Sequence, residues 1–113
     1  MENKKILLAD DENNIVQVMA AKLRNNGFEV LTAEDSPEAY NLYCNQKPDA
    51  IVIDYELIEQ LGKKAETIDV PMIILTTKDV KLKKNFTERL NKPFSPKELL
   101  TYVENVLTVS ASK

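Results

Sequence analysis

The sequence contains 113 residues, which is enough for a single domain that buries one hydrophobic core. It has no histidine and one cysteine, Cys44, so an internal disulfide, serine–histidine or cysteine–histidine catalysis and a histidine-ligated zinc site are excluded. The net charge of −3 argues against general nucleic-acid binding, and no apolar run is long enough to span a membrane. We therefore expect a cytoplasmic protein without direct nucleic-acid contact or membrane insertion, in which Cys44 is a small buried apolar residue.

Apolar, β-branched runs recur along the chain and predict strands, with helical spacing between them. The runs cover residues 5–9, 28–33, 49–53 and 71–75, with a weaker candidate at 87–91. Strands that are apolar on both faces and alternate with helices are typical of a parallel sheet covered on both sides. The predicted fold is α/β, a flavodoxin-like doubly wound three-layer (βα)5 domain with strand order 2-1-3-4-5, and we expect residues 1–113 to form this one domain.

The first helix is predicted over residues 12–26. Apolar residues recur there at helical spacing, and Gly27 can adopt the left-handed conformation that ends a helix. The inward stripe of this helix is expected to consist of Ile15, Val18, Met19 and Leu23.

Two later helices begin at serine–proline pairs. Ser36 is expected to be the N-cap of the second helix, with Pro37 in its first turn. Ser95 and Glu98 form the pattern of a capping box at the start of the last helix. The connection over residues 77–86 is short for a crossover between parallel strands, so its helix must be short. The apolar residues that the second and last helices are expected to bury are Ala39, Leu42 and Tyr43, and Leu99, Leu100, Val103, Val106 and Leu107.

Polar side chains follow the predicted strands at the points where they end. Asp10 and Asp11 follow the first strand, Asp54 the third, Thr76 the fourth and Lys92 the fifth. Each has a structural explanation of its own: an aspartate can cap a helix, threonine is an ordinary strand residue, and a lysine can lie at the surface. The carboxyl ends of parallel strands meet at one edge of a sheet, however, so these side chains should converge. Carboxylates, a hydroxyl and an ammonium group in one crevice indicate a site for a hard cation and a phosphate group.

The segments that carry these residues resemble bacterial two-component response regulator receiver domains. The matching segments are residues 6–12, 48–54, 71–76 and 91–94. The resemblance implies that Asp54 accepts a phosphoryl group from the phosphohistidine of a histidine kinase or phosphotransfer protein. It also implies an Mg²⁺ cofactor held by Asp11, by Asp54 and by the backbone carbonyl of Glu56, with Asp10 acting through a metal-bound water.

The resemblance further implies that the hydroxyl of Thr76 contacts the new phosphoryl group and that Lys92 pairs with it. Such a chain is a regulatory phosphoacceptor and not an enzyme in the usual sense. It acts through a downstream protein at the surface formed by the fourth helix, the fifth strand and the fifth helix. We expect a stand-alone signalling module, because no residues remain for an output domain.

The sequence departs from the family beside the expected site. The segments after Asp54 and after Thr76 are shorter than usual, Thr77 replaces a smaller residue, and Arg89 stands where the family has an aromatic switch residue. The alternative is therefore a degenerate receiver that binds partners without phosphorylation. Residues 78–98 hold an excess of basic groups, which suits either an acidic partner or a solvated helix face.

Two other classes of function fit the site less well. An aspartate-nucleophile phosphatase needs a second catalytic acid two residues after Asp54, where only Glu56 stands. Flavin binding needs a phosphate-binding loop rich in glycine, serine or threonine after the first strand, where this chain has acidic residues.

Overall fold

A computed structural model describes residues 3–77 and 87–111, and it confirms the predicted topology. The sheet has five parallel strands in the order β2-β1-β3-β4-β5. The strands are β1 (Lys5–Ala9), β2 (Glu29–Ala33), β3 (Ala50–Asp54), β4 (Met72–Thr76) and β5 (Thr87–Asn91). The chain leaves the neighbouring strands β1 and β3 toward helices on opposite faces of the sheet, which opens a crevice between their carboxyl ends.

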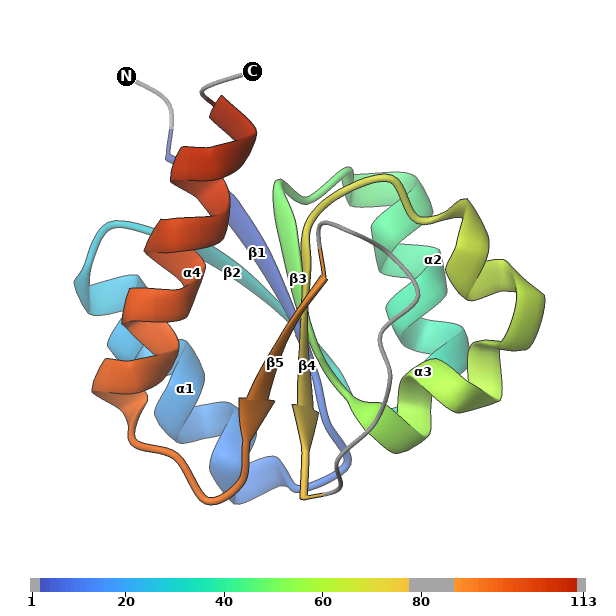
Figure 1. The fold of residues 1–113 in the computed structure, drawn as a ribbon, viewed down its shortest axis with the longest axis horizontal. Helices are drawn as coiled ribbons and strands as arrows, with labels where there is room; N and C mark the ends of the chain where they lie inside the picture. Colours follow the sequence, from blue (N-terminus) through green and yellow to red (C-terminus); the bar gives the residue numbers. More distant parts are fainter. Residues whose placement is uncertain (1–2, 78–86, 112–113) are drawn as a thin grey trace.

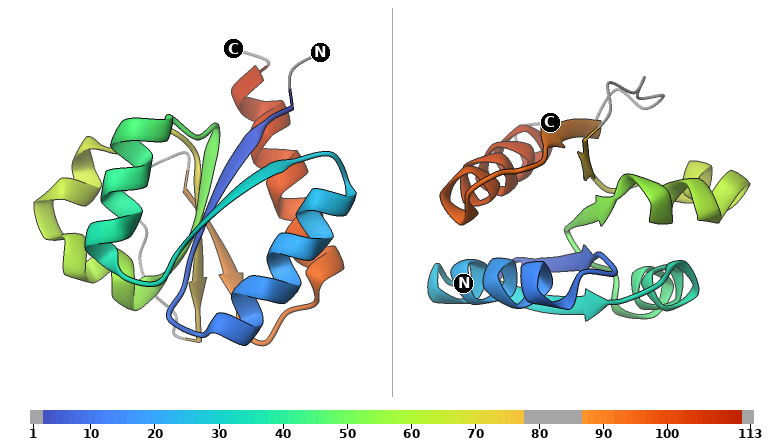
Figure 2. Two further views of the ribbon diagram at one scale, coloured as in Figure 1. Left: turned by 180° about the vertical axis from the view of Figure 1, so that it is seen from behind. Right: turned by 90° about the horizontal axis from the view of Figure 1, so that it is seen from below.

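Helices cover both faces of the sheet (Figures 1 and 2). They are α1 (Asn13–Asn25), α2 (Ser36–Gln46), α3 (Tyr55–Leu61), the 3₁₀ helix η1 (Gly62–Thr67) and α4 (Pro96–Ala111). Helices α1 and α4 lie on one face, and α2 and α3 lie on the other (Figure 2). The short helix predicted between residues 77 and 86 falls outside the described residues, apart from Thr77.

Alternation along the strands divides the core into two halves. In β1, Ile6 and Leu8 face α1 and α4, whereas Leu7 faces α2 and α3. Because both faces are buried, the central strands are apolar at nearly every position, as the sequence pattern indicated. None of the helices within the described ranges is long and apolar enough to cross a membrane.

The inward face of α1 differs from the predicted stripe. Val18 is 55% exposed, whereas Val16 and Ala20 are buried together with Met19 and Leu23. Met19 and Leu23 belong to both stripes, so the buried face is turned from the predicted one by less than the roughly 100° that separates successive helical residues. Both stripes are apolar, and packing against the sheet and α4 selects the one that includes the small residue Ala20.

The start of α2 also differs from the prediction by one residue. Asp35, and not Ser36, is the N-cap, because its carboxylate accepts a hydrogen bond of 2.9 Å from the Glu38 amide. Ser36 is the first residue of the helix and is buried. Cys44, predicted to be buried, is exposed, because Ala39 and Tyr43 set the inward face of α2 and Cys44 lies beyond it.

The start of α4 agrees with the prediction. The Glu98 amide donates to Ser95 Oγ at 3.1 Å, and the Ser95 amide donates to Glu98 Oε1 at 3.1 Å. These reciprocal bonds are the capping box that the sequence pattern indicated. The helix then buries Leu99, Val103 and Val106 against the sheet and α1.

Candidate functional site

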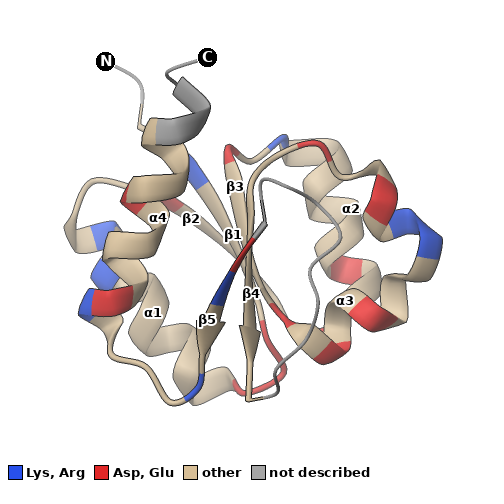
Figure 3. Cartoon of the chain, in the orientation of Figure 1, with Lys and Arg blue, Asp and Glu red and all other residues tan. Residues whose placement is uncertain are grey.

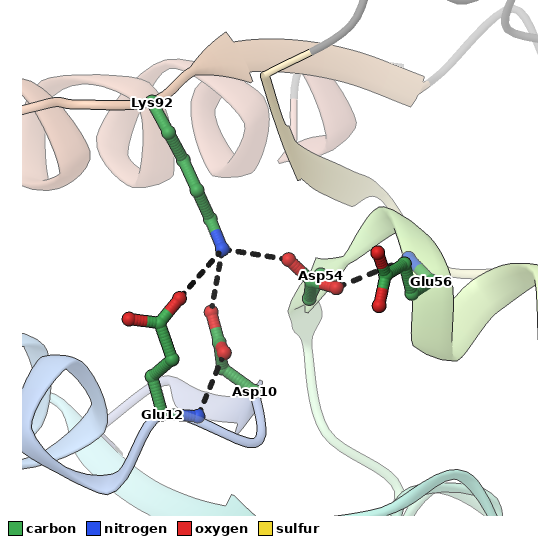
Figure 4. A network of polar contacts seen from close by, with 5 residues as sticks. All are labelled: Asp10, Glu12, Asp54, Glu56 and Lys92. Carbon is green, nitrogen blue, oxygen red and sulfur yellow. Dashed lines mark hydrogen bonds and ion pairs between the residues drawn. The ribbon is translucent and has the colours of Figure 1, made fainter.

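The polar residues at the strand ends meet at the carboxyl edge of the sheet. Asp10 directly follows β1 and has no exposed surface, Asp54 is the last residue of β3, and Thr76 is the last residue of β4; all three are buried. Lys92 follows β5 and reaches back toward the aspartates (Figure 4). Figure 3 shows acidic residues gathered at this edge, in the loop after β1 and at the start of α3.

The ammonium group of Lys92 is the centre of the site. Its Nζ lies 2.7 Å from Asp54 Oδ1, 3.3 Å from Asp10 Oδ2 and 3.6 Å from Glu12 Oε1. Glu12 was not among the predicted site residues, because a glutamate that follows Asp11 in the sequence can equally well lie at the surface without a partner. One cation therefore neutralises carboxylates from two strand ends and from the start of α1 (Figure 4).

Backbone amides hold the other oxygens of the two buried aspartates. The Glu12 amide donates to Asp10 Oδ1 at 3.0 Å, and the Glu56 amide donates to Asp54 Oδ2 at 3.1 Å. Asp54 is in this way the N-cap of α3. Asp54 therefore combines a helix-capping role with its contact to Lys92, and Asp10 combines a hydrogen bond within the loop after β1 with its own contact to Lys92.

Burial and charge shift the pKa values of the central groups. Burial raises the pKa of the Asp10 carboxyl, and the hydrogen bond from the Glu12 amide and the charge of Lys92 offset this only in part. Burial alone would lower the pKa of the Lys92 ammonium, but the hydrogen bond to Asp54 and the charges of Asp10 and Asp54 outweigh it and raise that pKa. Lys92 is therefore protonated at neutral pH and acts as the counter-charge of the site.

A cavity of about 370 Å³ opens beside these groups. Its lining residues are Asp11, Glu12, Asp54, Tyr55, Glu56, Leu75, Thr76, Thr77 and Lys92. Thr77 is exposed and also lines this cavity. The cavity brings the buried acidic group of β3 and the hydroxyl-bearing end of β4 into contact with solvent, so a small phosphorylated ligand or a metal ion can reach them.

The ligand atoms around the cavity fit a hard divalent cation. Carboxylate oxygens of Asp10, Asp11 and Glu12 lie within 4.8 Å of one another. Only oxygen ligands are offered, which is the preference of Mg²⁺. Asp54 is outside this group of three and is joined to Asp10 through Lys92. The structure thus brings Asp10 and Asp11 together as predicted, with Glu12 as an additional carboxylate.

Arg89 lies away from the acidic group, in the middle of β5. It pairs in register with Ile74 of β4, whose side chain packs on the face of the sheet that α2 and α3 cover. Arg89 is therefore half-buried on that face, while the next residue, Leu90, enters the core beneath α4. Four of the lysines in the basic stretch, Lys78, Lys81, Lys83 and Lys84, lie outside the described residues.

Comparisons with known proteins agree with this geometry. The response regulator receiver domain family matches residues 6–104. The chain is 34% identical to the phosphate regulon transcriptional regulatory protein PhoB of Pseudomonas aeruginosa, over 95% of this chain and 53% of that protein. It is 34% identical to the alkaline phosphatase synthesis transcriptional regulatory protein PhoP of Bacillus subtilis, over 93% of this chain and 49% of that protein. The structure of the chemotaxis protein CheY4 of Vibrio cholerae superposes with a TM-score of 0.75 at 29% identity, covering 92% of this chain and 98% of CheY4.

Two features of these alignments bear on the chain. It spans about half the length of the curated relatives that it matches. The alignment with PhoB of Pseudomonas aeruginosa is 121 positions long but includes 95% of the 113 residues, so this chain has no residue at about 14 of those positions. This shortening agrees with the reduced length expected after Asp54 and Thr76. Members of this family are regulatory phosphoacceptors that bind Mg²⁺ in an acidic pocket, and this chain belongs to the response regulator receiver domain family.

Proposed function

We propose that Asp54 accepts a phosphoryl group from the phosphohistidine of a histidine kinase or a phosphotransfer protein, with Mg²⁺ as cofactor. The observation that carries the proposal is the contact of 2.7 Å between Asp54 Oδ1 and the Lys92 ammonium at the edge of an open cavity. This contact holds the Asp54 carboxylate at the edge of the cavity and directs it at a cation. A carboxylate in that state is a competent nucleophile for phosphorus.

The transfer can be written with the residues of this chain. An oxygen of Asp54 attacks phosphorus and forms a P–O bond, while the P–N bond to the donor imidazole breaks and the electron pair stays with the imidazole nitrogen. Lys92 then lies next to the new phosphoryl oxygens, and the hydroxyl of Thr76 lines the same cavity and can donate a hydrogen bond to them. Positioned positive charge and donors are the main contributions that proteins make to phosphoryl transfer.

The acidic residues after β1 support the cofactor assignment. Asp10, Asp11 and Glu12 offer converging carboxylate oxygens, and we propose that Asp11 and Asp54, with the backbone carbonyl of Glu56, hold Mg²⁺ while Asp10 acts through a metal-bound water. When bound, Mg²⁺ supplies charge neutralisation for the transferring group. Lys92 provides the counter-charge of Asp10, Glu12 and Asp54 in the metal-free protein and so reduces the repulsion among these acids.

In a second candidate function, binding of the downstream protein does not depend on phosphorylation. Arg89 stands in β5 where the family has an aromatic switch residue, and it is half-buried beside β4. A guanidinium cannot be exchanged for an aromatic ring in an inward pocket without a large cost of desolvation. The alternative is therefore a degenerate receiver that binds its downstream protein at the surface containing β5 with little dependence on phosphorylation.

The proposed function is tested by intact mass after incubation with acetyl phosphate and Mg²⁺. We expect one phosphoryl group on the native protein and none on Asp54→Asn, and none on the native protein when EDTA replaces Mg²⁺. The matched control is Asp49→Asn, the same change just before the amino end of the same strand, which should be labelled like the native protein. Labelling of Asp54→Asn at the native level would show that another residue is the acceptor.

A further inference from the structure

Ser36 is the one buried polar residue in the described part of the chain that the proposed function does not use. The others are Asp10, Asp54 and Thr76, which all belong to the acidic site. Ser36 is only 4% exposed, because Asp35 has taken over the cap of α2 and the serine side chain points between α2 and α3. A buried hydroxyl is retained only where it has hydrogen-bond partners, so its partners indicate what it holds.

The partners of Ser36 are both in α3. Its Oγ lies 2.8 Å from the carbonyl oxygen of Leu57 and 2.9 Å from Oε1 of Gln60. A hydroxyl has one proton, so Ser36 donates it to only one of these two oxygens at a time. Helices α2 and α3 lie side by side on one face of the sheet (Figures 1 and 2), and the Ser36 hydroxyl joins them through this pair of acceptors.

Helix α3 depends on such contacts for its position. It has seven residues, and isolated helices of that length are not stable in water. Leu57 and Leu61 bury its inward side, but apolar contacts are not directional and leave its rotation poorly defined. The hydrogen bond from Ser36 is directional, and it is made to the residue next to Glu56.

The first turn of α3 is also part of the phosphorylation site. Asp54 caps the helix by accepting from the Glu56 amide at 3.1 Å, so a shift of this turn moves the carboxylate that faces Lys92. The backbone carbonyl of Glu56, assigned above to the metal, lies in the same turn. Ser36 contacts neither group directly, but it fixes the backbone that carries both.

We propose that Ser36 is a positioning residue of the phosphorylation site, which holds the first turn of α3 so that Asp54 and the Glu56 carbonyl keep the geometry needed for Mg²⁺ binding and phosphoryl transfer. This inference rests on the proposed function of Asp54. It gives the α2–α3 contact a role in the chemistry of the site as well as in stability.

The test compares Ser36→Ala with Tyr43→Phe. Both changes remove one hydroxyl through which α2 hydrogen-bonds to a neighbouring segment. The Tyr43 hydroxyl, however, lies near the amino ends of the strands, away from the acidic site, where it contacts the Thr67 carbonyl and Asp69. For Ser36→Ala we expect the Mg²⁺ dissociation constant to rise and the rate of acetyl-phosphate labelling to fall, each by about tenfold, the scale seen when groups that orient metal ligands are removed. For Tyr43→Phe we expect the native dissociation constant and rate, with a similar loss of stability.

A measurement on the metal-free protein shows directly whether Ser36 holds the first turn of α3 in place. Amide hydrogen exchange at Glu56 should accelerate in Ser36→Ala and stay at the native rate in Tyr43→Phe. Gln60→Ala removes only one of the two Ser36 contacts, at an exposed position, and should shift the Mg²⁺ dissociation constant in the same direction by a smaller factor.

Two results would overturn the inference. The first is a folded Ser36→Ala variant with the native Mg²⁺ affinity and the native labelling rate. If Ser36→Ala does not fold, the second is a Gln60→Ala variant with the native Mg²⁺ dissociation constant. Failure of the proposed function looks different, because the native protein would then remain unlabelled or Asp54→Asn would still be labelled.

Discussion

The ammonium group of Lys92 lies 2.7 Å from the carboxylate of Asp54, so the end of β5 is tied to the end of β3 although β4 lies between them. The lysine chain spans the crevice, and its charge also reaches Asp10 at 3.3 Å. Removal of this one cation leaves two buried carboxylates facing each other without a counter-charge, which is costly in a low-dielectric environment.

Substitution of Lys92 by methionine should therefore destabilise the metal-free protein. The side chains of Lys92 and Asp54 are 15% and 12% exposed, so we expect a loss of about 2–3 kcal/mol, below the roughly 3–5 kcal/mol of a fully buried pair. Urea unfolding in EDTA measures this loss. Lys97→Met, at an exposed position in the first turn of α4, is the control and should change stability by less than about 0.5 kcal/mol. Equal stability of the two variants would mean that the contact to Asp54 contributes nothing to the fold.

Asp10→Asn should have the opposite effect on the metal-free protein. Burial raises the pKa of this carboxyl in the folded state, so the associated stability is present at low pH and is lost as the pH rises through the folded pKa. At neutral pH the ionised carboxylate is thus unfavourable, and the neutral asparagine should raise the urea midpoint while keeping the acceptor for the Glu12 amide.

The increase in urea midpoint caused by Asp10→Asn should become smaller as the pH is lowered, because a protonated Asp10 carboxyl and an asparagine amide are then both neutral. Asp11→Asn is the comparison, since Asp11 is exposed and its removal should raise the midpoint less. Both variants should bind Mg²⁺ more weakly. A lower midpoint for Asp10→Asn at neutral pH would show that its contact with Lys92 outweighs the burial of its charge.

Tyr43 makes the stability of the chain sensitive to alkaline pH. Burial raises the pKa of its phenol, so its contribution to stability is present below a pH of about 10 and is lost as the pH rises through the folded pKa. Tyr43→Phe removes hydrogen bonds to Asp69 and to the Thr67 carbonyl and should cost about 1 kcal/mol at pH 8. The difference in unfolding free energy between the two proteins should decrease at pH 11; a constant difference would contradict this linkage.

Gly62 allows α3 to end and η1 to begin. Its φ of +58° with a ψ of −128° is a conformation that residues with a Cβ rarely adopt. No atom lies within 4 Å of the position that a Cβ would take, so Gly62→Ala should cost only the backbone strain, about 1–3 kcal/mol. Thermal unfolding measures this cost, and an unchanged midpoint would mean that the turn can adopt another conformation.

The strands and the meeting of the polar side chains at their ends could be predicted, because both follow from short stretches of sequence that fit only one arrangement. Apolar runs bounded by polar residues give parallel strands, and the carboxyl ends of such strands share an edge, so Asp10, Asp54, Thr76 and Lys92 had to meet. Even β5 was located correctly, although Leu90 is the only core residue among Glu88, Arg89, Leu90 and Asn91, the strand positions whose burial the structure describes.

The details that were wrong depend on packing between elements far apart in the sequence. Val16 and Val18 are both apolar, and only the sheet and α4 decide which one is buried. Asp35 and Ser36 are both good helix caps, and Ser36 is released from that role because α3 offers it partners. An exposed glutamate such as Glu12 has no local signal that would distinguish a contact with Lys92 from an ordinary surface position.

The most direct test of Asp54 as the acceptor is to locate the phosphoryl group on the chain. The native protein is labelled with acetyl phosphate and Mg²⁺, treated with borohydride, which reduces an acyl phosphate to an alcohol, and digested for peptide mass spectrometry. We predict homoserine in place of Asp54 and no change at Asp10 or Asp11. A reduced residue at Asp10 or Asp11, or a borohydride-resistant phosphate on a serine or threonine with Asp54 unmodified, would contradict the assignment.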